Sequence, residues 1–221
     1  MLYIMDLQEL HKSLSIRHGT FDEEIIEQRM ASMFIGSGDT VLELGSNIGR
    51  NSLVIGSILN SSDNLVTLEM DPVFHARCKE NRDLNGLKFH CVNKALSYSP
   101  LYAQFNKRHG EGGGYCVPTK HTPDYTECPR ATLEELEREH GKQFNAIVCD
   151  CEGGLYYILK DNPNLFEHMN KVILENDFPC IEHKEHVDGI LAACGFKRVF
   201  VEALPVGDWP CKEFFWETWT K

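Results

Sequence analysis

Short apolar runs alternate with amphipathic stretches along most of the chain. The run TVLEL at 40–44 has a single polar interruption near its end, which is typical of a short buried strand. Apolar residues at helical spacing follow it to about residue 59, and a second apolar run covers 65–68. The pattern therefore predicts strands that alternate with helices. Further strands are expected at 87–92, 146–149, 172–174, 198–203 and 214–216. Further helices are expected at 22–34, 72–85, 133–140, 155–169 and 185–194, with a break in the 155–169 helix at Asn162-Pro163.

This order of elements predicts a three-layer α/β fold with a mostly parallel sheet, because each helix can connect two parallel strands. The last two strands are joined by a loop that contains Pro205, Gly207 and Pro210. That loop is too short for a helical crossover, so these strands should form an antiparallel pair at the edge of the sheet. Residues 107–130 are rich in glycine, proline and polar side chains, which indicates a long loop. Within it, 110–114 is expected to be a lid that becomes ordered on ligand binding.

The length of 221 residues fits a single domain. We expect an N-terminal helical segment at 1–38, a core at 39–204 and a final edge strand within 205–221. Asp6 and Glu9 lie near the start, and no basic segment precedes an apolar one, so no signal peptide is expected. No apolar run approaches the length of a membrane span.

Cysteine usage and charge restrict the compartment and the partners. Nine cysteines are spread from Cys78 to Cys211 without a C-x-x-C pair, and several lie in apolar runs. We therefore expect reduced, buried thiols and a cytoplasmic protein. Lys and Arg number 22 against 33 for Asp and Glu, which gives a net charge of −11. Such a chain repels nucleic acid and anionic membranes on average, so no nucleic-acid partner is expected.

Candidate chemistry follows the first predicted strand, where the sequence reads GSNIG at 45–49. Ligands of open α/β sheets bind beyond the carboxyl ends of the strands. Gly45 permits a tight turn, Gly49 permits close backbone approach, and free N–H groups there can hold a carboxylate or phosphate. Asn47 stands where a dinucleotide motif G-x-G-x-x-G has its second glycine. A smaller anionic group is therefore favoured over a pyrophosphate.

Polar residues also follow the next two strands. Glu69 comes 24 residues after Gly45, the difference between their numbers, and an acid at that place can accept hydrogen bonds from both ribose hydroxyls. Asn93 follows the third strand, near the position of an adenine if Glu69 binds its ribose. Each feature alone is also typical of a plain turn or a solvated acid. Together they favour a ligand that contains adenosine.

The motifs ELGSNIG, TLEMDP, VNKALS, IVCDCEGG and VILEND occur in the order found in the FkbM-type methyltransferases, which the chain resembles over about 39–200. The sequence TLEEL at 132–136 also resembles a short motif that precedes the fourth strand in that family. Two residues depart from the family pattern: Gly154 replaces the usual alanine, and Arg50 stands where an aromatic residue is common.

The resemblance implies a Rossmann-like class I methyltransferase fold with a seven-stranded sheet and an S-adenosylmethionine-dependent O-methyltransferase. Its acceptor would be a sugar hydroxyl on a glycan or a glycosylated metabolite. In this alignment the methionine end of the cofactor lies against the glycine motif, Glu69 binds the ribose, and Met70 and Asn93 are near the adenine. The implied cofactor-binding residues are Glu43, Gly45, Ser46, Asn47, Gly49, Glu69, Met70, Asn93 and Asp150.

The reaction centre is expected at the ends of the fourth and fifth strands, with Asp150, Glu152, Glu175 and His183 as catalytic candidates. A carboxylate or histidine within reach of the acceptor hydroxyl can remove its proton. Alternatively, Asp150, Glu175 and Asp177 can hold Mg²⁺ or Mn²⁺, because hard cations prefer oxygen ligands.

Simpler interpretations remain beside these. Asp150 can cap the helix that begins near Gly153, and His183 with His186 can form a surface face of a helix. Tyr156 and Tyr157 are more typical of helix packing than of substrate contact. Two other functions are also open: methylation of RNA or protein, and a binding module that retains the cofactor pocket without catalysis.

Overall fold

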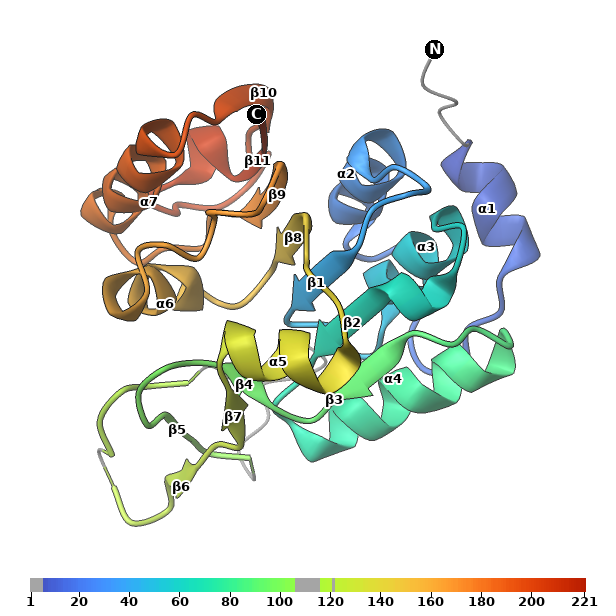
Figure 1. Cartoon of the computed structure of the whole chain (residues 1–221), viewed down its shortest axis with the longest axis horizontal. Helices are drawn as coiled ribbons and strands as arrows, with labels where there is room; N and C mark the ends of the chain where they lie inside the picture. Colours follow the sequence, from blue (N-terminus) through green and yellow to red (C-terminus); the bar gives the residue numbers. More distant parts are fainter. Residues whose placement is uncertain (1–5, 106–115, 121) are drawn as a thin grey trace.

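The computed structural model describes residues 6–105, 116–120 and 122–221. Seven strands form the main sheet: β1 (Val41–Leu44), β2 (Leu65–Leu68), β3 (His90–Val92), β8 (Ala146–Cys149), β9 (Lys171–Glu175), β10 (Lys197–Glu202) and β11 (Trp216–Thr220). Their order across the sheet is β10-β11-β9-β8-β1-β2-β3 (Figure 1). All neighbours from β3 to β9 pair in parallel, whereas β11 pairs antiparallel with both β9 and β10. The predicted mostly parallel sheet with an antiparallel edge pair is confirmed.

The strand order reverses beside β1. The chain runs from β1 through β2 to β3 on one side and later returns to β8 on the other side of β1. This reversal is the switch point at which open α/β sheets bind ligands. Leu44 and Cys149, the last residues of β1 and β8, are register partners. The segments that follow these two strands therefore meet at the expected ligand-binding edge.

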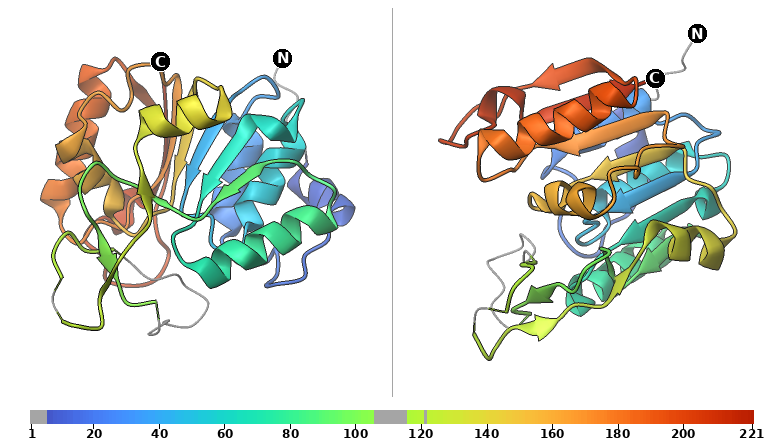
Figure 2. Two further views of the ribbon diagram at one scale, coloured as in Figure 1. Left: turned by 60° about the horizontal axis from the view of Figure 1, so that its bottom comes forward. Right: turned by 60° about the vertical axis from the view of Figure 1, so that its left-hand side comes forward.

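Helices cover both faces of the sheet, which the left view of Figure 2 shows nearly edge-on. Side chains alternate between the faces with the period of two expected for a strand. In β1, Val41 packs in the cluster that includes Leu53, whereas Leu42 packs in the cluster that includes Leu136. One face carries α1 (Leu7–Ser13), α2 (Ile25–Phe34), α3 (Arg50–Ile58) and α4 (Pro72–Leu84), and the other carries α5 (Leu133–His140), α6 (Gly154–Asp161) and α7 (Ile181–Ala193).

Local capping explains why two helices lie close to their predicted bounds. The side chain of Asp71 caps α4 by accepting a hydrogen bond from the N–H of Val73 at 2.7 Å, and Pro72 occupies the first helical position. Thr132 and Glu135 form a capping box at the start of α5. Gly141 ends that helix in a left-handed conformation.

Other bounds differ from the prediction for local reasons. Helix α6 ends at Asp161, at the expected break, because Pro163 cannot donate a helical hydrogen bond and restricts the residue before it. The helix does not resume between that break and residue 169, contrary to the prediction. Helix α7 begins at Ile181, four residues earlier than expected. The last strand is 216–220 rather than 214–216, because η2 (Lys212–Phe214) forms a short 3₁₀ turn. Helix α1 lies in the expected N-terminal helical segment at 1–38, although a separate helix was not predicted there, and the short η1 (Ser62–Asn64) was not expected from the sequence.

The expected long loop is in part structured. Two small sheets lie within 95–131, one parallel and one antiparallel. They consist of β4 (Ala95–Leu96) with β7 (Arg130–Ala131), and β5 (Tyr102–Ala103) with β6 (Thr126–Glu127). The expected lid at 110–114 is outside the described residues. In the part of the chain that the structure describes, no helix combines the length and apolar character needed to cross a membrane.

Candidate active site

The turn after β1 places Gly45 directly against the segment after β8. A Cβ atom on Gly45 would lie 1.6 Å from the carbonyl oxygen of Asp150, and the φ of Gly45 is +83°. No side chain fits at that distance, and the backbone conformation itself favours glycine. Gly49 has a φ of +85°, and a Cβ there would lie 2.7 Å from Sγ of Cys78. Both glycines are therefore required for the turn to pack against the protein.

The N–H groups of this turn are used within the protein. Gly45 and Ser46 both donate to the carbonyl oxygen of Leu68 at 3.0 Å, and Gly49 donates to the carbonyl oxygen of Ser46 at 2.7 Å. The expectation that these N–H groups are free to hold a carboxylate or phosphate is wrong. The turn shapes the site mainly through its close packing.

Glu69, at the end of β2, is buried with 8% of its surface exposed. Its Oε2 accepts a hydrogen bond from the N–H of Asn47, and its Oε1 accepts one from the N–H of Asp71, both at 2.8 Å. Burial raises the pKa of the Glu69 carboxyl to about 7, against the lowering effect of these hydrogen bonds. The backbone of Met70 also contributes a hydrogen bond. A carboxylate has about four acceptor positions, so about one remains for a ligand.

Asn93 supports Glu69 rather than facing a ligand. Its Nδ2 donates to the carbonyl oxygens of Glu69 and Met70 at 2.8 and 2.9 Å. Asn93 is not among the residues that line the cavity at this edge, whereas Met70 is. Asn93, which was expected beside an adenine, therefore stabilises the turn that contains Glu69 and Met70.

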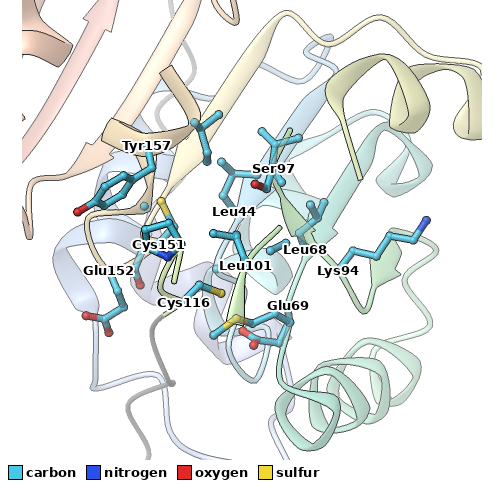
Figure 3. A pocket seen from close by; sticks show the side chains of 18 of the residues that line it. Leu44, Leu68, Glu69, Lys94, Ser97, Leu101, Cys116, Cys151, Glu152 and Tyr157 are labelled. Atoms are coloured by element: carbon cyan, nitrogen blue, oxygen red, sulfur yellow. The ribbon is translucent and has the colours of Figure 1, made fainter. Parts of the chain in front are cut away.

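A cavity of about 280 Å³ opens at the switch point. Figure 3 shows Glu152 and Tyr157 at one side of it and Glu69 at the other. Several lining residues come from segments with little predicted structure, such as Ser97, Leu101 and Cys116. Ser97 ends the VNKALS motif, but the sequence around Leu101 and Cys116 carries no motif, so only the fold shows that these two residues belong to the site. Six residues predicted from the sequence line the cavity: Gly45, Asn47, Glu69, Met70, Asp150 and Glu152.

A smaller cavity of about 10 Å³ adjoins Asp150, which lines both cavities. Glu43 and Ser46, expected at the cofactor, line this smaller space and not the main cavity. Glu43 is buried in β1 and accepts a hydrogen bond from the hydroxyl of Ser52. Burial raises the pKa of Glu43 to about 7. Its place in the core favours a supporting role over direct contact with a cofactor.

Three carboxylates converge near Asp150, and two of them, Glu27 and Asp150, line this smaller cavity. Glu27, Asp150 and Glu175 each have an oxygen within 4.8 Å of the other two. Burial raises the pKa of all three carboxyl groups, and neighbouring carboxylates raise all three further, although a hydrogen bond from Glu27 lowers that of Glu175. The sequence prediction missed Glu27, which lies on the buried face of α2 beside Met30 and Ala31. An acid on the apolar face of a helix was the signal that could have found it.

Asp177 has a different role from the one expected. Its Oδ1 accepts a hydrogen bond from the N–H of Gly153 at 2.7 Å, which fixes the turn before α6. It is not part of the group formed by Glu27, Asp150 and Glu175. The start of α6 at Gly153 has no side-chain cap, so the capping interpretation of Asp150 is wrong.

His183 packs against α6 and does not line the main cavity. Its ring stacks on Tyr156 with a centroid distance of 3.6 Å and an interplanar angle of 4°. Burial lowers the pKa of His183, which favours the neutral ring. His186 contacts the edge of the same tyrosine. Packing is thus the role of Tyr156, as expected, whereas Tyr157 lines the main cavity, contrary to the expectation.

Arg50 anchors the segment before α2 to the site. It is buried with 2% exposure, and its guanidinium forms ion pairs with Glu23 and Glu24. Its Nε also donates to the carbonyl oxygen of Thr20 at 2.8 Å. Glu24 lines both cavities and has a positive φ of 53°. The departure from the family pattern at Arg50 therefore has a structural purpose in this chain.

Comparisons with known proteins identify the fold. No protein-family model and no curated protein sequence matches the chain. Precorrin-6y C5,15-methyltransferase from Geobacter metallireducens GS-15 aligns with a TM-score of 0.54 and 9% identity, over 95% of this chain and 94% of that one. The ribosomal protein L11 methylase from Lactobacillus delbrueckii subsp. bulgaricus aligns with a TM-score of 0.50 and 13% identity, over 92% and 79% of the two chains. The tRNA m1G37 methyltransferase of M. jannaschii aligns with a TM-score of 0.52 and 8% identity, over 88% of this chain and 46% of that one.

The chain therefore has the Rossmann-like fold of class I S-adenosylmethionine-dependent methyltransferases, as expected. The names of the three similar proteins specify a precorrin, a ribosomal protein and a tRNA. One fold thus serves acceptors of very different chemistry, and the acceptor must be argued from the site. None of the comparisons points to the FkbM family in particular.

Proposed function

We propose that this protein is an S-adenosylmethionine-dependent O-methyltransferase of the FkbM type. The observation that carries the proposal is the contact between Gly45 and Asp150 at the switch point, where the main cavity opens. Glu69 lies at one side of that cavity and Glu152 at the other (Figure 3). The motif order of the sequence supports the same assignment.

The described residues suit a cofactor with a ribose and a flat aromatic base. The Glu69 carboxylate keeps acceptor capacity for a ribose hydroxyl, in addition to the hydrogen bonds that it accepts from the backbone of Asn47, Met70 and Asp71. Met70, Leu96 and Ile158 line the same cavity and provide apolar surface for a base. When bound, S-adenosylmethionine supplies a methyl group on a positively charged sulfonium.

The chain's own part in the reaction is to align a hydroxyl and accept its proton. Methyl transfer to oxygen releases that proton late, so one correctly placed base is sufficient. Asp150 is the proposed base because it lines the main cavity, and burial raises its pKa above the usual range of a carboxyl group. Glu152 lines the same cavity and is proposed to orient the acceptor. His183 receives no role, because its ring is packed against Tyr156.

A sugar hydroxyl is the proposed acceptor. The family resemblance supports this choice, and the net charge of −11 disfavours a polyanionic acceptor such as RNA. RNA is nevertheless the acceptor named for several structurally similar proteins, so it belongs in the test.

Calorimetry tests the cofactor directly. We expect the purified chain to bind S-adenosylmethionine and S-adenosylhomocysteine and not to bind NAD. Tighter binding of NAD than of S-adenosylhomocysteine would contradict the proposal. The comparison is informative because NAD also contains an adenosine and differs in its pyrophosphate.

Transfer of a labelled methyl group tests the acceptor. Reactions with sugars and glycans, with RNA and with protein are run side by side at one salt concentration, because affinity for RNA depends strongly on salt. We expect label on sugar hydroxyls. Label on RNA or protein would contradict the sugar acceptor but support the assignment as a methyltransferase. Cofactor binding without transfer to any acceptor would indicate a binding module.

A further inference from the structure

We propose that the carboxylates of Glu27, Asp150 and Glu175 bind a divalent cation at the edge of the active-site cavity. Their oxygens lie within 4.8 Å of one another, although the residues come from α2, the segment after β8 and the end of β9. Oxygen ligands lie about 2.0–2.6 Å from Mg²⁺ or Ca²⁺, so two ligands on opposite sides of an ion are about 4–5 Å apart. All three carboxylates can therefore contact one ion without a change in the backbone.

An independent observation at the same place is a buried amide oxygen. Asn51, in the first turn of α3, is 8% exposed, and its Oδ1 has no hydrogen-bond partner among the described residues. Asn51 lines the smaller cavity together with Glu27 and Asp150. That cavity, of about 10 Å³, has room for about one particle of the size of a water molecule. An amide oxygen beside carboxylates is a ligand set that hard cations prefer.

The charge balance around the three carboxylates supports a cation. In the part of the chain that the structure describes, none of them forms an ion pair with a basic side chain. The nearby guanidinium of Arg50 is engaged by Glu23 and Glu24. Glu27 and Glu175 share a side-chain hydrogen bond, which supplies no positive charge to the group. Buried carboxylates without a positive partner are unfavourable in their ionised form, and a bound divalent cation supplies that partner.

The role of the inferred ion in the reaction rests on the proposed function, and the ion makes that function more specific. Asp150 lines both the main cavity and the smaller one, so a cation that it holds lies next to the acceptor space. Such an ion binds an acceptor oxygen and lowers the pKa of its hydroxyl group. A divalent cation with open positions also favours an acceptor with two neighbouring oxygens, such as the diol of a sugar.

Titration with Mn²⁺, followed by electron paramagnetic resonance, tests the ion without any methyl transfer. The full chain is titrated at pH 7.5 in the absence of cofactor, and the signal of free Mn²⁺ reports the bound fraction. We expect saturable binding of about one ion per chain, with competition by Mg²⁺. The same additions should raise the melting temperature, because a ligand that binds only the folded state stabilises it.

Glu27→Gln keeps the size of the side chain and removes one charged ligand. We expect it to weaken Mn²⁺ binding at least about tenfold and to reduce the Mn²⁺-dependent shift of the melting temperature. The variant should fold, because it removes a buried repulsive charge, and its melting temperature without metal should be at least that of the parent. Glu175→Gln provides a second variant with the same expectation.

Asp177→Asn is the matched control, since Asp177 lies at the same acidic edge but outside the group of three. Its amide oxygen can still accept from Gly153, and we expect less than about a threefold change in Mn²⁺ affinity. Absence of saturable Mn²⁺ binding, or unchanged affinity in Glu27→Gln, would overturn the proposal. Equal losses of Mn²⁺ affinity in Glu27→Gln and Asp177→Asn would show that the proposed set of ligands is wrong.

Calorimetry with S-adenosylhomocysteine separates this proposal from the proposed function. Mn²⁺ binding without S-adenosylhomocysteine binding would contradict the methyltransferase assignment and retain the cation site. S-adenosylhomocysteine binding without Mn²⁺ binding would contradict the cation site alone.

Discussion

Glu69 and Asn47 are joined across the switch point, because Oε2 of Glu69 accepts a hydrogen bond from the backbone N–H of Asn47 at 2.8 Å. This bond links the end of β2 to the glycine turn after β1. The other carboxylate oxygen accepts from the N–H of Asp71 at the start of α4. Glu69 therefore holds the shape of the turn and also lines the main cavity. Replacing it should change both cofactor binding and stability.

Glu69→Gln should weaken S-adenosylhomocysteine binding at least about tenfold, a loss of about 1.4 kcal/mol. The amide keeps one oxygen for the turn but loses charge-assisted hydrogen bonds to ribose hydroxyls, worth about 1.5–3 kcal/mol each before compensation by water. Calorimetry at pH 8 measures the change. Glu80→Gln is the control, because Glu80 lies on the surface of α4, where it pairs with Arg17 and His18. An unchanged dissociation constant in folded Glu69→Gln would place the ribose elsewhere.

The pKa of Glu69 makes its contribution to stability depend on pH. Burial raises that pKa from 4.5 to about 7, so folding favours the protonated form. The stability associated with this protonation is fully present below about pH 4.5, the unfolded-state pKa, and is lost as the pH rises through about 7. Glu69→Gln does not titrate. Its free energy of unfolding, relative to the parent, should therefore increase by roughly 1–3 kcal/mol between pH 5 and 8.

Urea denaturation at pH 5, 6, 7 and 8 measures that difference. Comparing the variant with the parent at each pH cancels the other titrating groups, including Asp63, whose pKa is lowered mainly by its hydrogen bond with Lys142. A difference that does not vary with pH would show that Glu69 is ionised at the same pH in the folded and unfolded chains.

Gly45→Ala should destabilise the protein strongly, by at least about 2–4 kcal/mol. The added Cβ would lie 1.6 Å from the carbonyl oxygen of Asp150, so the turn and the segment after β8 must move apart. Gly141→Ala is the matched control, because Gly141 also has a positive φ, +63°, but nothing lies within 4 Å of its Cβ position. It should lose only about 1–2 kcal/mol. Similar midpoints of urea denaturation for the two variants would contradict the close packing at Gly45.

The sheet was predictable because its strands are short and apolar and alternate with helices, two of which begin at clear local caps. Asp71 with Pro72, and Thr132 with Glu135, mark helix starts through chemistry that is local in sequence. The 95–131 segment was less predictable, since its strands are two residues long and pair across the segment. Periodicity cannot be read from two residues, and long-range pairing leaves no local signal.

The site was predictable where it follows strand ends and obscure where it depends on packing. Gly45, Glu69 and Asp150 follow strands that meet at the switch point, so topology alone brings them to one edge. Glu27 comes from a helix that precedes the sheet, and only tertiary packing places it beside Asp150. Asn93 shows the converse, because its position at a strand end is correct but its side chain donates to the protein itself.

Asp150→Asn should lower turnover by about 10² or more while S-adenosylmethionine affinity changes less than about threefold. The amide has nearly the same size but cannot accept the proton of the acceptor hydroxyl, and it is a poorer ligand for a hard cation. Stability should not fall, because Asp150 does not cap α6 and the substitution removes a charge that burial and Glu175 disfavour. Steady-state kinetics on an acceptor that the parent enzyme methylates, together with calorimetry and urea denaturation, measure the three quantities.

Chelation separates the two ways in which Asp150 can act. If the inferred cation takes part in the reaction, EDTA should abolish the activity of the parent enzyme, and added Mg²⁺ or Mn²⁺ should restore it. If Asp150 acts as a direct base, EDTA should have no effect, and the pH at which turnover rises should report a raised carboxyl pKa in the parent. Full activity of Asp150→Asn would exclude both roles. Glu152, the other predicted catalytic acid that lines the main cavity, would then be the next candidate for the base.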